Sequence, residues 1–130
     1  KWKMIEKMKQ PGVIYHGRVG QGELAKEWSK ADIWLYPPHS FRETNCISAL
    51  EAQASKTLVV SRWNGALGET VGERGIILPI DSKPEQIVDL IAAKYDIIDR
   101  ERAREYVSFY TWEWVAVSML DLYKRLEKVI

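Results

Sequence analysis

The chain has 130 residues with a formal net charge of +1, and its length suits a single domain that can bury a substantial core. The near-zero charge gives no electrostatic reason to expect nucleic acid or an anionic membrane as a partner. A single cysteine excludes an internal disulfide framework and suits a reducing compartment. No apolar run approaches the ~20 residues of a membrane span and no secretory leader is expected, so we predict a cytoplasmic location.

The first thirty residues predict a helix, a strand and a second helix, in that order. Residues 1–10 carry apolar side chains three positions apart, which is typical of a short amphipathic helix, and Pro11 ends it. Val13–His16 is predicted to form a strand, which a glycine-containing loop follows. A second helix is predicted over Glu23–Lys30, with Leu24 on its apolar face.

The next segment predicts a buried strand, a turn and a helix. Ile33–Tyr36 is short, apolar and bulky, and Pro37 ends it because proline cannot donate to a sheet ladder. From Thr44 or Asn45, both good N-cap residues, apolar and small side chains recur at helical spacing as far as Ser55. We expect the free N–H groups at the start of this helix to point into the crevice above the sheet and to bind an anion, most commonly a phosphate.

The remaining residues alternate two further strands with four helices. The strands are predicted at Thr57–Ser61 and Gly75–Pro79, and the helices at Ala66–Val71, Pro84–Tyr95, Asp99–Phe109 and Trp112–Val129. Asn64 and Gly65 predict a turn. Strands that alternate with helices through short links predict an α/β fold, a Rossmann-like parallel sheet with helices on both faces, over one domain of residues 1–130.

Two carboxylates frame the predicted phosphate site. Glu43 stands at the helix entrance and Glu51 follows eight residues later, which places them ~12 Å apart along a continuous helix axis at ~1.5 Å per residue. That separation exceeds the ~5–10 Å of a glycosidase carboxylate pair. We therefore expect the two acids to hold different parts of one long ligand, with its phosphates between them.

This arrangement resembles the signature of retaining GT-B glycosyltransferases of the family 4 type, the glycosyl transferases group 1. An E-x7-E pair alone is weakly specific, but the ordered strands, turns and glycines around it are much more specific. The resemblance covers roughly residues 12–125. It is carried by Val13–Val19 and Leu24 upstream, by Glu43-x7-Glu51 with Ala52-Gln53-Ala54, and by Leu58–Ser61, Asn64–Gly72 and Gly75–Pro79 downstream.

The resemblance implies a role for each part of the site. Glu43 would be the catalytic residue and touch the transferred sugar near its anomeric centre, and Glu51 would bind the ribose hydroxyls. The remaining donor-binding residues would act through backbone amides at the diphosphate, beside the base, or from the loop over the crevice. They are Asn45, Cys46, Ile47 and Ser48 at the diphosphate, Gly17, Arg18 and Val19 beside the base, and His39 in the loop, and Leu24 would be a further donor-binding residue.

Simpler interpretations of these residues stay open. Glu43 at the helix entrance would be stabilised by the helix dipole by ~0.5 kcal/mol wherever its side chain points, and Glu51 and Arg18 could be solvated charges. His39 could be a surface-loop histidine. We expect no nucleophilic role for Cys46, since no base stands beside it, and two histidines without further ligand spacing predict neither a metal site nor another cofactor.

By this resemblance, the parent enzyme would transfer a sugar from a UDP- or GDP-type nucleotide sugar to a hydroxyl acceptor, with retention of configuration. The chain would be its C-terminal donor-binding domain, without the N-terminal acceptor domain that is its expected partner and without the first strand of its own domain. Alone it would bind nucleotide weakly and transfer nothing. A nucleotide-sugar epimerase of the same architecture, or a non-enzymatic α/β binding domain, stays open as an alternative.

Two positions depart from the family pattern. Lys56 stands where the family usually has a glycine that ends the signature helix, often at positive φ. A lysine in that conformation costs ~1 kcal/mol. Asn45 replaces a residue that is often aromatic, which changes the expected shape of the sugar pocket.

Overall fold

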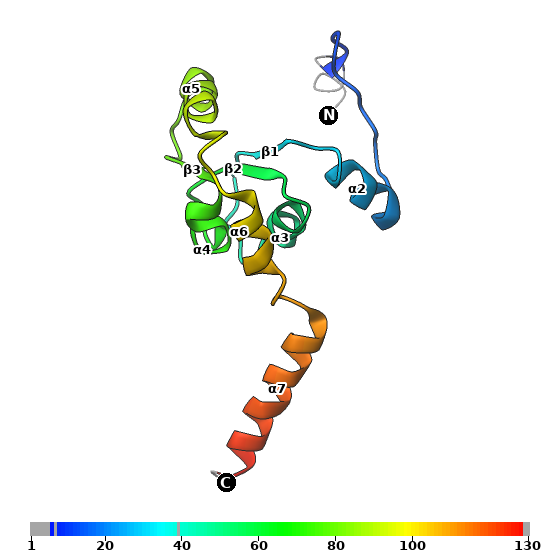
Figure 1. The fold of residues 1–130 in the computed structure, drawn as a ribbon, viewed down its shortest axis with the longest axis vertical. Coiled ribbons are helices and arrows are strands. Elements are labelled where there is room, and N and C mark those ends of the chain that lie inside the picture. The colour runs from blue at the N-terminus through cyan, green and yellow to red at the C-terminus, as the bar shows by residue number, and fades with distance from the viewer. Residues whose placement is uncertain (1–5, 7, 39, 129–130) are drawn as a thin grey trace.

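Three parallel strands form the single sheet of the computed structural model, which describes residues 6, 8–38 and 40–128 (Figure 1). They are β1 (Ile33–Tyr36), β2 (Leu58–Arg62) and β3 (Ile76–Leu78), in the spatial order β1–β2–β3. Tyr36 pairs with Ser61 across the first ladder. The predicted parallel α/β fold is confirmed, and β1 has its predicted bounds.

Six α-helices lie before, between and after the strands in the described part of the chain. They are α2 (Gln21–Trp28), α3 (Ile47–Ala54), α4 (Leu67–Val71), α5 (Pro84–Lys94), α6 (Arg100–Val107) and α7 (Trp112–Glu127), and a 3₁₀ turn, η1 (Gly72–Arg74), follows α4. The side chain of the N-cap residue accepts a hydrogen bond in two of them: Asp99 accepts from the Arg102 N–H at the start of α6, and Thr111 accepts from the Trp114 N–H at the start of α7. The helix predicted over residues 1–10 falls largely outside the described residues.

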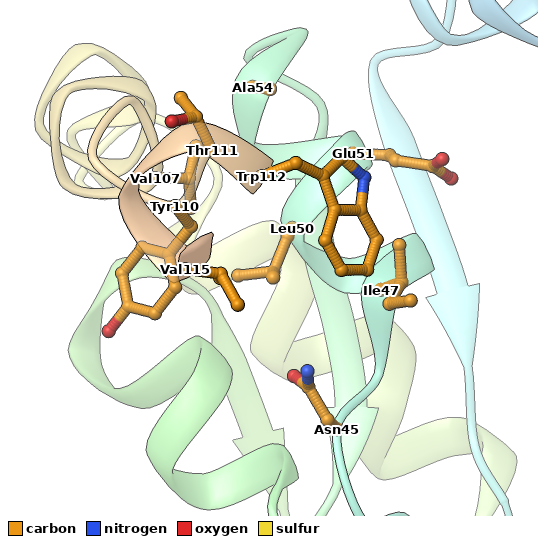
Figure 2. A pocket seen from close by; sticks show the side chains of 10 residues that line it. All are labelled: Asn45, Ile47, Leu50, Glu51, Ala54, Val107, Tyr110, Thr111, Trp112 and Val115. Atoms are coloured by element: carbon orange, nitrogen blue, oxygen red, sulfur yellow. The ribbon is translucent and has the colours of Figure 1, made fainter. Parts of the chain in front are cut away.

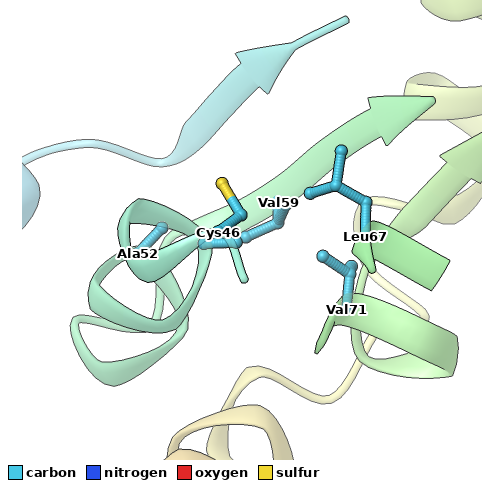
Figure 3. Packing of buried hydrophobic residues seen from close by; sticks show 6 residues of the cluster. Cys46, Ala52, Val59, Leu67 and Val71 are labelled. Carbon is cyan, nitrogen blue, oxygen red and sulfur yellow. The ribbon is translucent and has the colours of Figure 1, made fainter. Parts of the chain in front are cut away.

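Helices cover both faces of the sheet, with α3, α4 and α6 on one side and α5 on the other (Figure 1). Successive residues of the central strand β2 point to opposite faces, so each face receives its own apolar cluster. Val59 packs with the cluster on the α3 and α4 side (Figure 3), whereas Leu58 and Val60 pack with Ile87 of α5. Because β2 is buried on both faces, its sequence does not alternate apolar and polar side chains. This explains why the strand was predicted from the continuous apolar run Leu58–Val60.

The segment Val13–His16 is not a strand, which corrects the sequence prediction. It is exposed, and Figure 1 shows this part of the chain running apart from the sheet. At its start the Val13 N–H donates to the Gln10 carbonyl at 3.1 Å, which is a turn contact and not a ladder bond. An apolar run becomes a strand only beside another strand that satisfies its backbone groups, and the described chain places none next to this one.

The helix α7 extends away from the sheet (Figure 1), and none of its described residues is buried. Its apolar side chains therefore face solvent in this structure, although their spacing is that of a helix that packs on one face. They are Trp112, Trp114, Val115, Val117, Met119, Leu120, Leu122, Tyr123 and Leu126. Neither α7 nor any other described helix has the length and apolar character that crossing a bilayer requires.

Candidate functional site

The turn that follows β2 holds the backbone of the loop that carries Glu43. The Asn64 side-chain amide donates to the Phe41 carbonyl at 2.7 Å, and the Ala66 N–H donates to the Glu43 carbonyl at 2.8 Å. Gly65 lies between them at φ +56, and a Cβ on it would stand 2.1 Å from the Glu43 carbonyl oxygen. The turn predicted at this point therefore also fixes the position of Glu43 in the loop.

Tyr36, the last residue of β1, holds the side chain of Glu43. Its hydroxyl donates to Glu43 Oε1 at 2.5 Å. This hydrogen bond is the main reason why the pKa of Tyr36 rises to about 12, since losing the proton would place a second negative charge beside the carboxylate. The hydroxyl thus remains a proton donor throughout the neutral range.

The first turn of α3 begins later than the sequence predicted. The N-cap position is Cys46, without a side-chain cap, and the helix starts at Ile47. Thr44 and Asn45, the two predicted N-cap residues, stay in the loop before it. The ~12 Å estimated between the two acids assumed one continuous helix, so it does not apply here.

Around this helix start, exposed and buried side chains alternate. Asn45 and Ile47 are exposed, Ser48 is half-buried and Cys46 is buried in the apolar cluster of Figure 3. Burial, with smaller contributions from Glu43 and Glu51, raises the pKa of the Cys46 thiol. The thiolate that a nucleophile requires is therefore disfavoured.

Glu51 lies at the edge of two hollows on the surface of α3. One of about 300 Å³ lies between α2 and α3, and Leu24, Trp28 and Glu51 are among its lining residues. Another of about 300 Å³ lies between α3 and the start of α7 (Figure 2). Asn45 and Ile47 line the second hollow with Glu51, whose carboxylate points away from Tyr110 and Val115 in the view of Figure 2.

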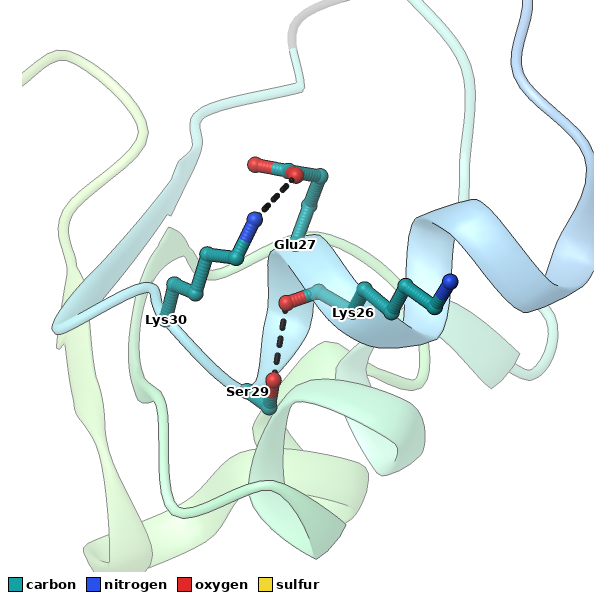
Figure 4. Close-up of polar contacts among 4 residues, drawn as sticks. All are labelled: Lys26, Glu27, Ser29 and Lys30. Carbon is teal, nitrogen blue, oxygen red and sulfur yellow. Dashed lines mark hydrogen bonds and ion pairs between the residues drawn. The ribbon is translucent and has the colours of Figure 1, made fainter.

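Leu24 shares the first hollow with Glu51 because the end of α2 is anchored to Thr57, the residue before β2. The Thr57 hydroxyl lies 3.0 Å from the carbonyls of both Trp28 and Ala31. The last turn of α2 is closed by a hydrogen bond from Ser29 to the Lys26 carbonyl (2.8 Å) and by the Lys30–Glu27 ion pair (2.9 Å), both drawn in Figure 4. The ion pair lowers the pKa of Glu27.

The structure brings some predicted site residues together and leaves others apart. Leu24 shares one hollow with Glu51 and another, of about 410 Å³, with Ser48. Glu43 lines none of these three hollows, nor do Gly17, Arg18 and Val19, which belong to the segment that runs apart from the sheet. His39 lies outside the described residues. The binding roles of all these residues stay predictions.

Sequence reasoning missed Tyr36 and Asn64 as parts of the site. Tyr36 could have been noticed as a hydroxyl at the carboxyl end of a strand, where parallel α/β sheets gather functional groups. Asn64 was interpreted only as a turn residue, because a sequence does not show which loop a turn touches.

Within the described residues, no three His, Cys, Asp or Glu side chains form a group that could hold a metal ion.

Comparison with known proteins places this geometry in a family. No curated protein matches the chain. Among solved structures, the sucrose-phosphate synthase of Thermosynechococcus elongatus superposes with a TM-score of 0.76 at 23% identity, over 99% of this chain and 34% of that one. At this identity the likeness shows the fold, that of a GT-B glycosyltransferase domain. The family described as "Glycosyl transferases group 1" matches residues 1–96, so the predicted resemblance to this group is confirmed and the chain belongs to that family.

Proposed function

We propose that this chain is the donor-binding domain of a retaining glycosyltransferase, which moves a sugar from a UDP- or GDP-type nucleotide sugar to a hydroxyl acceptor. One observation carries the proposal: in a chain of this family, Glu43 and Glu51 stand on either side of the start of α3. Leu24 lines the hollow beside Glu51, as a base pocket next to a ribose partner requires.

The diphosphate would bind at the first turn of α3. The first N–H groups of a helix have no carbonyl partner within that helix, and the positive end of the dipole favours an anion there. Asn45 and Ile47 are exposed at this end, so a ligand has access to it. Catalysis would then consist of positioning and of stabilising the departing diphosphate, without a metal or other cofactor.

Each acid has its own part of the donor in this proposal. Glu43, whose carboxylate accepts a hydrogen bond from the Tyr36 hydroxyl, would also accept hydrogen bonds from the hydroxyls of the transferred sugar. Glu51 would accept from the ribose hydroxyls, with the base against Leu24. Gly17, Arg18 and Val19 would complete the base pocket, and His39 would lie over the crevice. These contributions require the exposed segment 13–19 to lie against the domain in the complete protein.

The complete protein would include an acceptor domain. The chain spans 34% of the solved enzyme that it resembles, so most of a comparable enzyme would lie outside it. The solvent-facing apolar side of α7, including Trp112 and Trp114, is a suitable surface for that domain. The isolated chain would bind nucleotide weakly and transfer nothing, and we place the enzyme in the cytoplasm because a lone cysteine suits a reducing compartment.

Calorimetry and turnover of the full-length protein test the proposal. Glu51→Ala should weaken UDP or GDP binding roughly tenfold or more, as loss of hydrogen bonds to a charged group predicts. Glu43→Ala should abolish most turnover and leave binding of the free nucleotide nearly unchanged. Glu85→Ala on α5, at the opposite face of the sheet, is the matched control and should change neither.

Two outcomes would contradict this assignment. Full turnover by Glu43→Ala would remove its catalytic role, and absence of nucleotide binding by the full-length protein would remove the donor site. Incubation of the full-length protein with one nucleotide sugar and no acceptor distinguishes a transferase from an epimerase. An epimerised nucleotide sugar as the product would identify an epimerase in place of a transferase.

A further inference from the structure

We infer that Tyr36 is a positioning residue that holds the Glu43 carboxylate in the orientation in which it meets the donor sugar, with the Asn64–Ala66 turn fixing the backbone beneath it. This inference rests on the proposed function of Glu43 and adds to it. Neither the family assignment nor the comparison with solved structures gives a role to Tyr36 or to the turn.

The hydroxyl of Tyr36 has a fixed direction because three contacts hold the residue. Its backbone is the last rung of β1 and is paired with Ser61 of β2. Its carbonyl accepts a hydrogen bond from the Ser61 hydroxyl at 2.5 Å. Its ring stacks on Trp34, two residues earlier on the same face of the strand, with 4.9 Å between centroids and 5° between planes.

Glu43 would otherwise be a mobile acid on an open loop. Phe41, two residues before it, is 55% exposed, and Arg42 is exposed as well. The Ala66 N–H binds the Glu43 carbonyl at 2.8 Å, and Tyr36 binds Oε1 at 2.5 Å. Backbone and carboxylate are thus restrained from the ends of two adjacent strands, which is the kind of support that keeps a functional group in its productive geometry.

The hydrogen bond also leaves the carboxylate able to bind a sugar. An ionised carboxylate has two oxygens and about four acceptor positions, and Tyr36 occupies one of them as a donor. The remaining positions can accept from sugar hydroxyls. With a pKa of about 12, Tyr36 keeps its proton in any assay near neutral pH, so the contact persists during turnover.

Steady-state kinetics of the full-length protein with the nucleotide sugar test the inference. Tyr36→Phe keeps the ring on Trp34 and removes only the hydroxyl. It should lower kcat by roughly tenfold or more, because the acid loses its orientation, and leave the Kd for the free nucleotide within about twofold. Tyr95→Phe is the matched control, since its hydroxyl donates to Asp32 Oδ1 at 3.3 Å, and it should leave kcat unchanged.

A double variant separates positioning from a general structural effect. In a Glu43→Ala background, Tyr36→Phe should cause no further loss of kcat, because the group it orients is gone. Additive losses would overturn the inference, as would a wild-type kcat for Tyr36→Phe in an enzyme that Glu43→Ala inactivates. Full activity of Glu43→Ala would instead overturn the proposed function itself.

A titration covers the case in which Tyr36→Phe does not fold. Site-resolved NMR of the tyrosine rings in the full-length protein should show Tyr36 ionising near pH 12. Glu43→Gln should bring that pKa down towards the ordinary 10.0, since the amide carries no charge. An unchanged pKa would mean that Tyr36 does not bind the carboxylate, and the inference would then fail.

Discussion

Lys56 and Glu101 form an ion pair that joins the end of α3 to the start of α6. Lys56 has φ +62, the only positive φ of a non-glycine residue in the described part of the chain. The sequence predicted this conformation, because Lys56 stands where the family usually has glycine. The structure adds that the side chain at this strained position has a partner on another helix.

Replacing Lys56 by glycine separates the strain from the ion pair. In a Glu101→Gln background, where the pair is already absent, Lys56→Gly should raise the free energy of unfolding by about 1 kcal/mol, because glycine adopts positive φ at little cost. In the wild-type background, loss of the pair should offset up to about 1 kcal/mol of this gain. Urea denaturation measures both, and equal gains in the two backgrounds would show that the pair contributes nothing.

Gly75 allows β3 to approach β2 closely. A Cβ on it would stand 2.5 Å from the Val59 carbonyl oxygen and 2.6 Å from Val71 Cγ1. Gly75→Ala should therefore lower the free energy of unfolding by about 1–3 kcal/mol through overpacking. Gly22→Ala in α2, where no atom lies within 4 Å of the added Cβ, is the control and should instead raise it by about 0.5–1 kcal/mol. Destabilisation by both variants would contradict the steric explanation.

Gln53 connects α3 to α4 and η1 from a fully buried position. Its amide nitrogen donates to the carbonyls of Ala49 (3.0 Å) and Thr70 (3.1 Å), and its oxygen accepts from Arg74 Nε at 3.3 Å. Gln53→Leu should lower the free energy of unfolding by about 1–3 kcal/mol, because it leaves the buried Thr70 carbonyl with one partner fewer. Gln21→Leu, at the exposed start of α2, should cost less than about 1 kcal/mol.

The Tyr36–Glu43 bond predicts a dependence of stability on alkaline pH. The folded-state pKa of Tyr36, about 12, lies above its ordinary value of 10.0. The stabilisation is therefore fully present below pH 10 and is lost as the pH rises from 10 through 12. Chemical denaturation in this window should show a steeper fall for the wild type than for Tyr36→Phe.

Tyr110 requires a control in the same experiment. Its hydrogen bond with Tyr106 raises its pKa as well, so it loses stabilisation in the same direction as the pH rises. Tyr110→Phe should remove only its own share of the slope. If Tyr36→Phe leaves the alkaline slope unchanged, the Tyr36–Glu43 bond does not contribute to stability.

Removal of α7 tests whether this helix contributes to the core. None of its described residues is buried, so a chain that ends at residue 110 should keep its free energy of unfolding within about 1 kcal/mol. The same deletion should reduce self-association in sedimentation experiments, because it removes a row of exposed apolar side chains. A loss of several kcal/mol would show that α7 packs on the domain in solution.

Local features of the sequence determined the strands, the helices and the turn. β1 has its predicted bounds, Pro84 begins α5 as expected, and Lys56 has the positive φ that the helix end requires. These features depend on side-chain periodicity and on the backbone preferences of single residues, which neighbours in sequence largely fix. The parallel sheet follows from their alternation.

Tertiary contacts decided what those local patterns left open. Val13–His16 has the composition of a strand but no neighbour in the sheet, and α3 begins at Ile47, after the two predicted N-cap residues Thr44 and Asn45. The sequence of a segment does not show whether another strand or loop lies beside it in the folded chain. For the same reason only the folded chain joins Tyr36 to Glu43, since that contact depends on where a strand end and a turn meet in space.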